Sequence, residues 1–209
     1  ELRKSDFKRL DETETVYLDF TGGNLYSSSQ VKQHAEYLLN DVYGNPHSMN
    51  PTSIRSTKLV ESTRQRILRF FNAQDDYYLI FTPNASGALK IIGESYPFNP
   101  NGHFLLPFDN HNSVNGIREY ARAKGADVTY SPLTIDDLRF DEPTLLNYLQ
   151  SNTGYENKLF AYPAQSNVSG VKHSLDWVKE AHKNGWDVLL DASAFVPTSK
   201  LDLKEVTPD

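Results

Sequence analysis

Short apolar runs alternate with stretches of helical apolar spacing along most of the chain. The apolar runs predict five strands, over residues 77–82, 103–108, 127–133, 158–162 and 188–191. Runs that are apolar at almost every position are typical of strands covered on both faces. The intervening stretches carry apolar residues on one side of a helix, and they predict helices over residues 85–94, 113–124, 143–150 and 174–183.

This alternation indicates a chain built from βα units. It predicts an α/β fold with a mostly parallel sheet and helices on both faces. Gly125 and the pair Asn184-Gly185 mark the ends of two of the helices, because these residue types close helices readily.

The first part of the chain has a different pattern. Residues 16–20 form a short strand-like run followed by Gly22-Gly23. Two longer stretches have the apolar spacing of helices, residues 29–39 and 52–71. We expect residues 1–50 to form an N-terminal arm with an opening strand and helix, and residues 51–209 to form one large domain.

Composition narrows the classes of function. The net charge of the 209 residues is −6, with both signs mixed along the chain, which argues against nucleic acid as a partner. The chain has no cysteine, so these residues hold no disulfide, cysteine zinc site or cysteine nucleophile. No apolar run approaches the ~20 residues of a membrane span, and the charged start lacks the apolar segment of a signal peptide. We therefore expect a cytoplasmic protein without a membrane partner.

Polar loops follow four of the predicted strands. In open α/β sheets, ligands bind beyond the carboxyl ends of the strands. Four loops with useful chemical groups at that edge predict one shared site. They are Pro83-Asn84-Ala85-Ser86, Asp109-Asn110-His111, Gln165-Ser166-Asn167 and Asp191-Ala192-Ser193.

The first of these loops suits an anion. Small residues such as Ala85 at a strand-to-helix turn expose backbone N–H groups at the positive end of a helix. The hydroxyl of Ser86 can add a further donor. The alternative is that Ser86 only caps the helix.

Two further side chains are candidates for contact with a planar ligand. A neutral imidazole at His111 can stack on a ring or move protons, although it can equally be a structural histidine. His47 is a weaker candidate of the same kind. Asn167 can donate to a phenolic oxygen, or it can bond its own backbone in a turn.

Asp191 is the most specific candidate because it ends an apolar strand. A buried carboxylate is costly unless it is paired. A protonated pyridine nitrogen would be a suitable partner, since the pairing keeps the nitrogen cationic and the ring electron-withdrawing. A helix cap or a salt bridge would satisfy Asp191 as well.

Four segments together resemble a known family, in their order and spacing from residue 16 to the end of the chain. They are residues 17–23, 43–48, 162–170 and 189–192. They are similar to the class V aminotransferase group of fold-type I pyridoxal phosphate (PLP) enzymes, which includes cysteine desulfurases. Within this group, the sequences of the four segments are most similar to the amino-terminal domain of molybdenum cofactor sulfurases.

The resemblance implies PLP as the cofactor and a role for each matching residue. Ala85 and Ser86 correspond to residues that hold the phosphate group. His111 corresponds to the histidine that stacks on the cofactor ring and relays protons. Asn167 corresponds to the residue near the ring hydroxyl, and Asp191 to the partner of the pyridine nitrogen.

The resemblance also implies that part of the site is absent from these residues. The lysine that carries the cofactor aldehyde would follow Asp191 by roughly two dozen residues, beyond Asp209; Lys200 and Lys204 come too early. Residues 51–209 would then be an incomplete cofactor-binding domain, truncated at its C-terminal side. We expect this chain alone to bind PLP weakly and without a covalent bond. Three residues after Asp191, this chain has Ala194 where many members of the resembled family have glutamine.

The implied function is PLP-dependent action on an amino acid, with cysteine as the substrate and sulfur transferred from it. A homodimer, or association with the missing C-terminal half, is the implied assembly. Another lyase or epimerase of the same family is an alternative, as is a cofactor-free relative that acts as a binding module. A nucleotide-binding domain is not supported, because the chain has neither GxGxxG nor GxxxxGK[ST].

Overall fold

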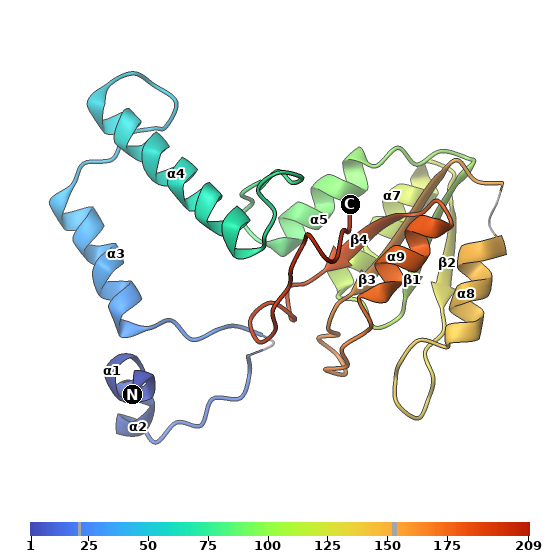
Figure 1. The fold of residues 1–209 in the computed structure, drawn as a ribbon, viewed down its shortest axis with the longest axis horizontal. Helices are drawn as coiled ribbons and strands as arrows, with labels where there is room; N and C mark the ends of the chain where they lie inside the picture. Colours follow the sequence, from blue (N-terminus) through green and yellow to red (C-terminus); the bar gives the residue numbers. More distant parts are fainter. Residues whose placement is uncertain (21, 152–153) are drawn as a thin grey trace. The chain divides into compact units, whose positions relative to one another are not determined.

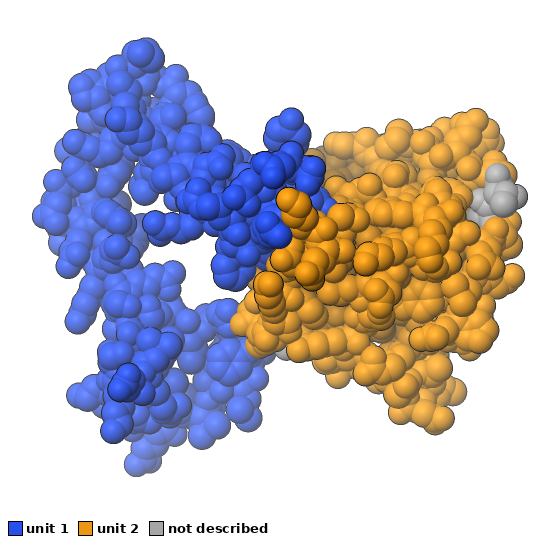
Figure 2. Space-filling model, viewed as in Figure 1, with its two compact units in different colours: residues 1–79 blue, residues 80–209 orange. Residues whose placement is uncertain are grey.

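The computed structural model describes residues 1–20, 22–151 and 154–209. The chain divides into two compact units, Glu1–Leu79 and Ile80–Asp209, which Figure 2 shows in blue and orange. The division at residue 50 that the sequence predicts stays a prediction. None of the helices in the described ranges is long and apolar enough to cross a membrane.

The first unit consists of helices joined by extended segments (Figure 1). The helices are α1 (Leu2–Asp6), α2 (Lys8–Glu12), α3 (Ser28–Asn40) and α4 (Pro51–Phe70). The two long ones begin where the sequence provides a cap: Ser27 Oγ accepts from the Gln30 N–H, and Asn50 Oδ1 accepts from the Ser53 N–H. They confirm the predicted helices over 29–39 and 52–71, but residues 16–20 form no strand.

The second unit is built on a four-stranded sheet in which every pairing is parallel. The order across the sheet is β2-β1-β3-β4. The strands are β1 (Gly102–Pro107), β2 (Asp127–Ser131), β3 (Asn157–Pro163) and β4 (Asp187–Asp191). The α/β class and the parallel sheet are confirmed.

Helices alternate with the strands close to where the sequence predicts them, with α5 preceding β1. They are α5 (Ala85–Ser95), α6 (Asn112–Asn115), α7 (Ile117–Ala123), α8 (Glu142–Ser151) and α9 (Asp176–Lys183). The helix predicted over 113–124 is divided at Gly116. Gly125 and Gly185 follow α7 and α9 with φ of 81° and 71°, the left-handed conformation that ends a helix.

Both faces of the sheet are covered, and alternate residues of β1, β3 and β4 enter different cores. Phe104 and Leu106 of β1 pack with residues of α5, α6 and α7, whereas Leu105 packs with residues of α8 and α9. Leu159 and Phe160 of β3 divide in the same way. This explains the continuous apolar runs, since a strand between two cores has no polar face.

The strand predicted over residues 77–82 is not formed. Tyr78 and Ile80 are 96% and 72% exposed, although the run is apolar. A strand forms only when a neighbour accepts and donates its backbone hydrogen bonds. Neither edge strand of the sheet, β2 or β4, pairs with this run among the described residues.

The order of the strands determines where a ligand can bind. From the central strand β1, the chain adds β2 on one side and then β3 on the other, so the direction of winding changes between β1 and β3 (Figure 1). Ligands of open α/β sheets bind outside the carboxyl ends at such a switch point. The loops after β1 and β3 are the ones that carry His111 and Asn167.

Candidate cofactor site at the carboxyl ends of β1, β3 and β4

The first turn of α5 presents unpaired backbone donors. Asn84 is the N-cap, with its Oδ1 accepting from the Gly87 N–H at 2.8 Å, so Ser86 is not the cap. The N–H groups of Ala85 and Ser86 point out of this end of the helix and bond no other described residue. This turn can therefore bind an anionic group.

The hydroxyl of Ser86 connects this turn to the neighbouring helix. Its Oγ lies 2.5 Å from Ser113 Oγ in α6. Both serines line a pocket of about 380 Å³ between α5 and α7, which Gly116 and Tyr120 line as well. The two hydroxyls add polar hydrogen-bonding groups close to the free backbone donors of α5.

His111 follows β1 and caps α6. Its Nδ1 accepts from the Ser113 N–H at 3.1 Å, so the proton of the neutral ring lies on Nε2. The ring itself is exposed. His111 therefore caps α6, as in the structural alternative, and its side chain is still exposed.

The hairpin after β3 carries Asn167 at its turn. The turn is organised by Ser166, whose Oγ accepts from the N–H groups of Val168 and Ser169 at 3.2 and 3.3 Å. The exposed side chain of Asn167 makes no hydrogen bond to the described residues, so it does not bond its own backbone. It remains available for a ligand.

Asp191 ends β4 and is half-buried. Its Oδ1 accepts from the Ser193 N–H at 3.0 Å, and its carbonyl oxygen accepts from the Ala164 N–H at 2.9 Å. Within the described residues no lysine, arginine or histidine pairs with this carboxylate, so the salt-bridge alternative is not observed. The cap-like bond to Ser193 is observed, and one carboxylate oxygen stays free for a cationic ligand.

Asn110 joins the two central strands at this edge. Its Nδ2 donates to the carbonyl oxygens of Pro107 at 3.2 Å and Ala161 at 3.1 Å. Four side-chain oxygens in the segments that follow β1 and β3 are buried without a partner in the described structure. They belong to Asp109, Asn110, Asn115 and Gln165. Unpaired buried acceptors are rare in native structures, and each calls for an explanation, of which a functional role is one.

The sequence did not single out the contact between Asp109 and His173. Asp109 Oδ2 and His173 Nε2 are 2.8 Å apart, and both side chains are almost completely buried. The feature of the sequence that could have pointed to this contact is a histidine three residues after Gly170, at the end of the hairpin that carries Asn167. Their separation of 64 positions hid the pairing from sequence patterns.

His47, two lysines and Ala194 complete the residues that the sequence singled out. His47 belongs to the first unit, with φ of 69° and its N–H bonded to Thr57 Oγ1 at 2.8 Å, and its contact with a ligand stays a prediction. Lys200 is exposed, 3.6 Å from Asp202, and Lys204 is exposed as well. Ala194 is buried.

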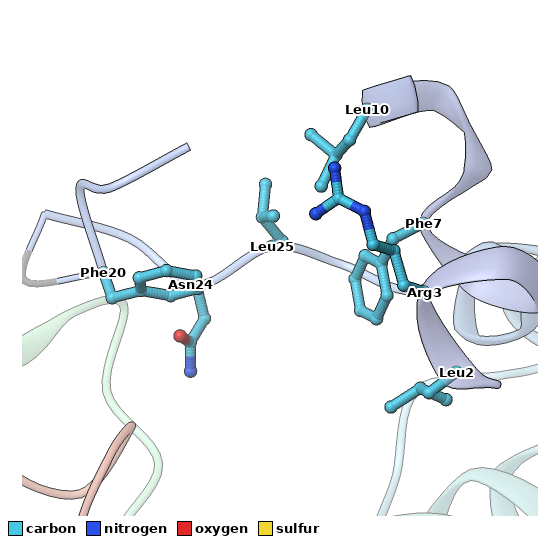
Figure 3. Close-up of a pocket in the computed structure, with 7 residues that line it drawn as sticks. All are labelled: Leu2, Arg3, Phe7, Leu10, Phe20, Asn24 and Leu25. Carbon is cyan, nitrogen blue, oxygen red and sulfur yellow. The ribbon is translucent and has the colours of Figure 1, made fainter. Parts of the chain in front are cut away.

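A separate pocket in the first unit lacks this chemistry. It has a volume of about 440 Å³ and is lined mainly by apolar side chains, which Figure 3 shows: Leu2, Arg3, Phe7, Leu10, Phe20, Asn24 and Leu25. Its one charged lining group, Arg3, is paired with Asp11 at 2.8 Å.

Solved structures of a cysteine desulfurase and of C-DES share the fold. The apo structure of the enzyme from Thermococcus onnurineus NA1 matches with a TM-score of 0.85 at 22% identity, over 100% of this chain and 50% of that chain. A C-DES mutant with glycine covalently linked to its PLP cofactor matches with a TM-score of 0.79 at 16% identity, over 99% and 53%. At these identities the likeness concerns the fold alone, and it confirms the predicted fold class.

Sequence relatives are molybdenum cofactor sulfurases. Identity to the Arabidopsis thaliana protein is 35% over 242 residues, which covers 100% of this chain and 29% of that protein. Identity to the Homo sapiens protein is 38% over 220 residues, covering 97% and 24%. The chain thus spans less than a third of the length of these relatives. Residues 16–209 match the family model for aminotransferase class-V. The resemblance drawn from the four sequence segments is confirmed: the chain belongs to the aminotransferase class-V family.

Proposed function

We propose that this chain provides the phosphate, ring and nitrogen contacts of a PLP site, and that the protein transfers sulfur from cysteine. The observation that carries the proposal is Asp191, a half-buried carboxylate at a strand end that has no cationic side chain beside it among the described residues. Family membership supports the cofactor, and the names of the relatives support the reaction.

The residues present fit the chemical groups of PLP. The free N–H groups of Ala85 and Ser86 at the positive end of α5 suit its phosphate. The exposed imidazole of His111 suits its ring, and the unbonded amide of Asn167 suits its phenolic oxygen. Asp191 suits the protonated pyridine nitrogen, the one cationic group of the cofactor.

Each side chain has a defined task in this proposal. The α5 turn binds and orients the phosphate, and His111 covers one face of the ring. His111 Nε2, which carries the proton while Nδ1 accepts from Ser113, could donate that proton at the substrate and afterwards take one up again. Asp191 holds the proton on the pyridine nitrogen. When bound, the cofactor supplies an electron-withdrawing ring that stabilises negative charge on the substrate carbon.

The substrate and the sulfur acceptor belong to the proposal as well. The cysteine desulfurases that share the fold support cysteine as the sulfur donor. These 209 residues contain no cysteine, so a thiolate that receives the sulfur belongs to residues outside this sequence or to another protein. Exposed apolar side chains on α3 and α4, including Leu38, Leu39 and Phe70, support self-association or packing against a further segment.

A titration with PLP tests the proposal, followed by absorption and by fluorescence. We expect the affinity of Asp191→Asn to fall about 10- to 100-fold, because a charge-assisted hydrogen bond contributes about 1.5–3 kcal/mol. Asp136→Asn is the matched control, since Asp136 is exposed on a loop. Equal affinities for the two variants, or no binding of PLP by the unmodified protein, would contradict the proposal.

A different reaction of the same family is the second candidate, because residues outside this chain can select the substrate. Assays with the full-length protein would compare cysteine with other amino acids and measure sulfide or persulfide in parallel with transamination products. Sulfur release from cysteine alone supports sulfur transfer. Turnover of another amino acid without sulfur release supports the second candidate.

A further inference from the structure

Asp109 and His173 form a buried polar contact behind the candidate site. Asp109 follows β1, and His173 follows the hairpin after β3. Their side chains are 6% and 1% exposed, and 2.8 Å separates Asp109 Oδ2 from His173 Nε2. Polar groups this deeply buried are costly unless they are bonded to each other, so the contact holds the two segments at one separation.

The contact extends into the turn that carries Asn167. The Asp109 carbonyl oxygen accepts from Ser166 Oγ at 3.0 Å. The same Ser166 oxygen accepts from the N–H groups of Val168 and Ser169, which lie on the other side of Asn167. On the opposite strand of the hairpin, the His173 N–H donates to the Ala164 carbonyl oxygen at 3.1 Å. Asp109 therefore holds the hairpin at two points, directly at Ser166 and through His173.

The same residue is close in the chain to the other ring contact. Asp109 precedes His111 by two positions, and between them Asn110 bonds the carbonyl oxygens of Pro107 and Ala161. The ring of Phe140 packs against the His173 ring, with the centroids 4.4 Å apart. The loop with His111 and the hairpin with Asn167 are thus joined through buried groups that have little freedom to shift.

We infer that Asp109 and His173 are positioning residues that set the place of Asn167 relative to His111. The inference rests on the proposed function, in which these two side chains contact one cofactor. His173 touches no ligand in this arrangement and acts through Asp109 and the Ala164 carbonyl oxygen, which hold the hairpin. Groups behind a site that orient the contacting residues commonly change affinity 10- to 100-fold when they are removed.

Hydrogen exchange of the protein without added cofactor tests the first half of the inference. His173→Ala is expected to speed exchange of the Val168 and Ser169 amides by about 10-fold or more, because Asp109, whose carbonyl oxygen fixes their acceptor Ser166, loses its contact with His173. His173→Gln, which can place an N–H where His173 Nε2 lies, is expected to restore slow exchange. His182→Ala, on α9 and bonded to Asp209, is the control and leaves these amides unchanged. Unchanged exchange in His173→Ala overturns the inference.

A double-mutant cycle on the affinity for PLP tests the second half. His173→Ala is expected to weaken binding about 10- to 100-fold when Asn167 is present, and less than about 2-fold in the Asn167→Ala background. A residue that only stabilised the fold would weaken binding equally in both backgrounds, and that result overturns the inference. If His173→Ala does not fold, His173→Asn replaces it in both experiments, since its side chain is too short to make the contact.

The two experiments separate this inference from the function on which it rests. Absence of PLP binding by the unmodified protein refutes the proposed function. Exchange of the Val168 and Ser169 amides is measured without the cofactor, so it still decides whether the Asp109–His173 contact fixes the hairpin. Binding of PLP with additive effects of His173→Ala and Asn167→Ala refutes the positioning role alone.

Discussion

Replacing Asn110 with alanine is expected to destabilise the junction of β1 and β3. The Asn110 side chain is 3% exposed, and its Nδ2 donates to the carbonyl oxygens of Pro107 and Ala161. Alanine removes both bonds and leaves two carbonyl oxygens at the ends of the central strands without this donor. Water reaches them with difficulty, because Ala161 and Pro107 are themselves buried.

The magnitude follows from these two bonds. Each contributes about 1 kcal/mol net, and a buried acceptor left unpaired costs about 1–3 kcal/mol more. Partial rearrangement of the structure around the substitution lowers the sum of these costs, so we expect the free energy of unfolding to fall by about 2–4 kcal/mol. For a chain of this size, that corresponds to a decrease of roughly 4–16 °C in Tm.

Thermal and urea unfolding provide the assay, with the fluorescence of buried Trp186 as the probe of the second unit. Asn112→Ala is the matched control: it removes the same side chain from an exposed position two residues away and is expected to change stability by less than about 0.5 kcal/mol. If both variants lost the same small amount of free energy of unfolding, the two hydrogen bonds of the Asn110 amide would not stabilise the junction of β1 and β3.

Two further predictions concern packing and pH. Gly93→Ala is expected to lower stability by about 1–3 kcal/mol, because the new Cβ would lie 2.6 Å from the Tyr120 ring. Gly116→Ala, whose Cβ would meet nothing closer than 3.5 Å, is the control for unfolding measurements and should not be destabilised to this extent. Burial lowers the pKa of His103 below its ordinary 6.5. The unfolded state therefore binds this proton more readily, and the free energy of unfolding should fall as the pH drops below about 6.5. Urea titrations from pH 5 to 8 should show a shallower decline for His103→Gln, and an unchanged decline would contradict the assignment.

Much of the fold was predictable because its main determinant is periodic in the sequence. Continuous apolar runs such as 103–108 and 158–162 correspond to strands that lie between two cores. The run over 77–82 has the same pattern and forms no strand, since its outcome depends on a pairing partner. An apolar pattern indicates which side chains favour burial and how they are spaced. It carries no information about whether a neighbouring strand is there to complete the sheet.

The candidate site was predictable in its place and only partly in its contacts. Parallel strands bring the loops with His111, Asn167 and Asp191 to one edge, and this follows from the strand predictions alone. The N-cap of α5 was harder to predict, because Asn84 and Ser86 are both good caps and only the backbone geometry selects Asn84. The contact between Asp109 and His173 depends on the tertiary fold, so no local pattern reveals it.

The protonation state of the pyridine nitrogen is the most direct test of the account, because it reports the contact assigned to Asp191. Nitrogen NMR of PLP labelled with ¹⁵N at the ring and bound to the protein would measure it, in the unmodified protein and in Asp191→Asn. We expect a protonated nitrogen at neutral pH that loses its proton in the variant. An unprotonated nitrogen in the unmodified protein, or the same chemical shift in both proteins, would contradict the assignment of this strand-end carboxylate to the cofactor.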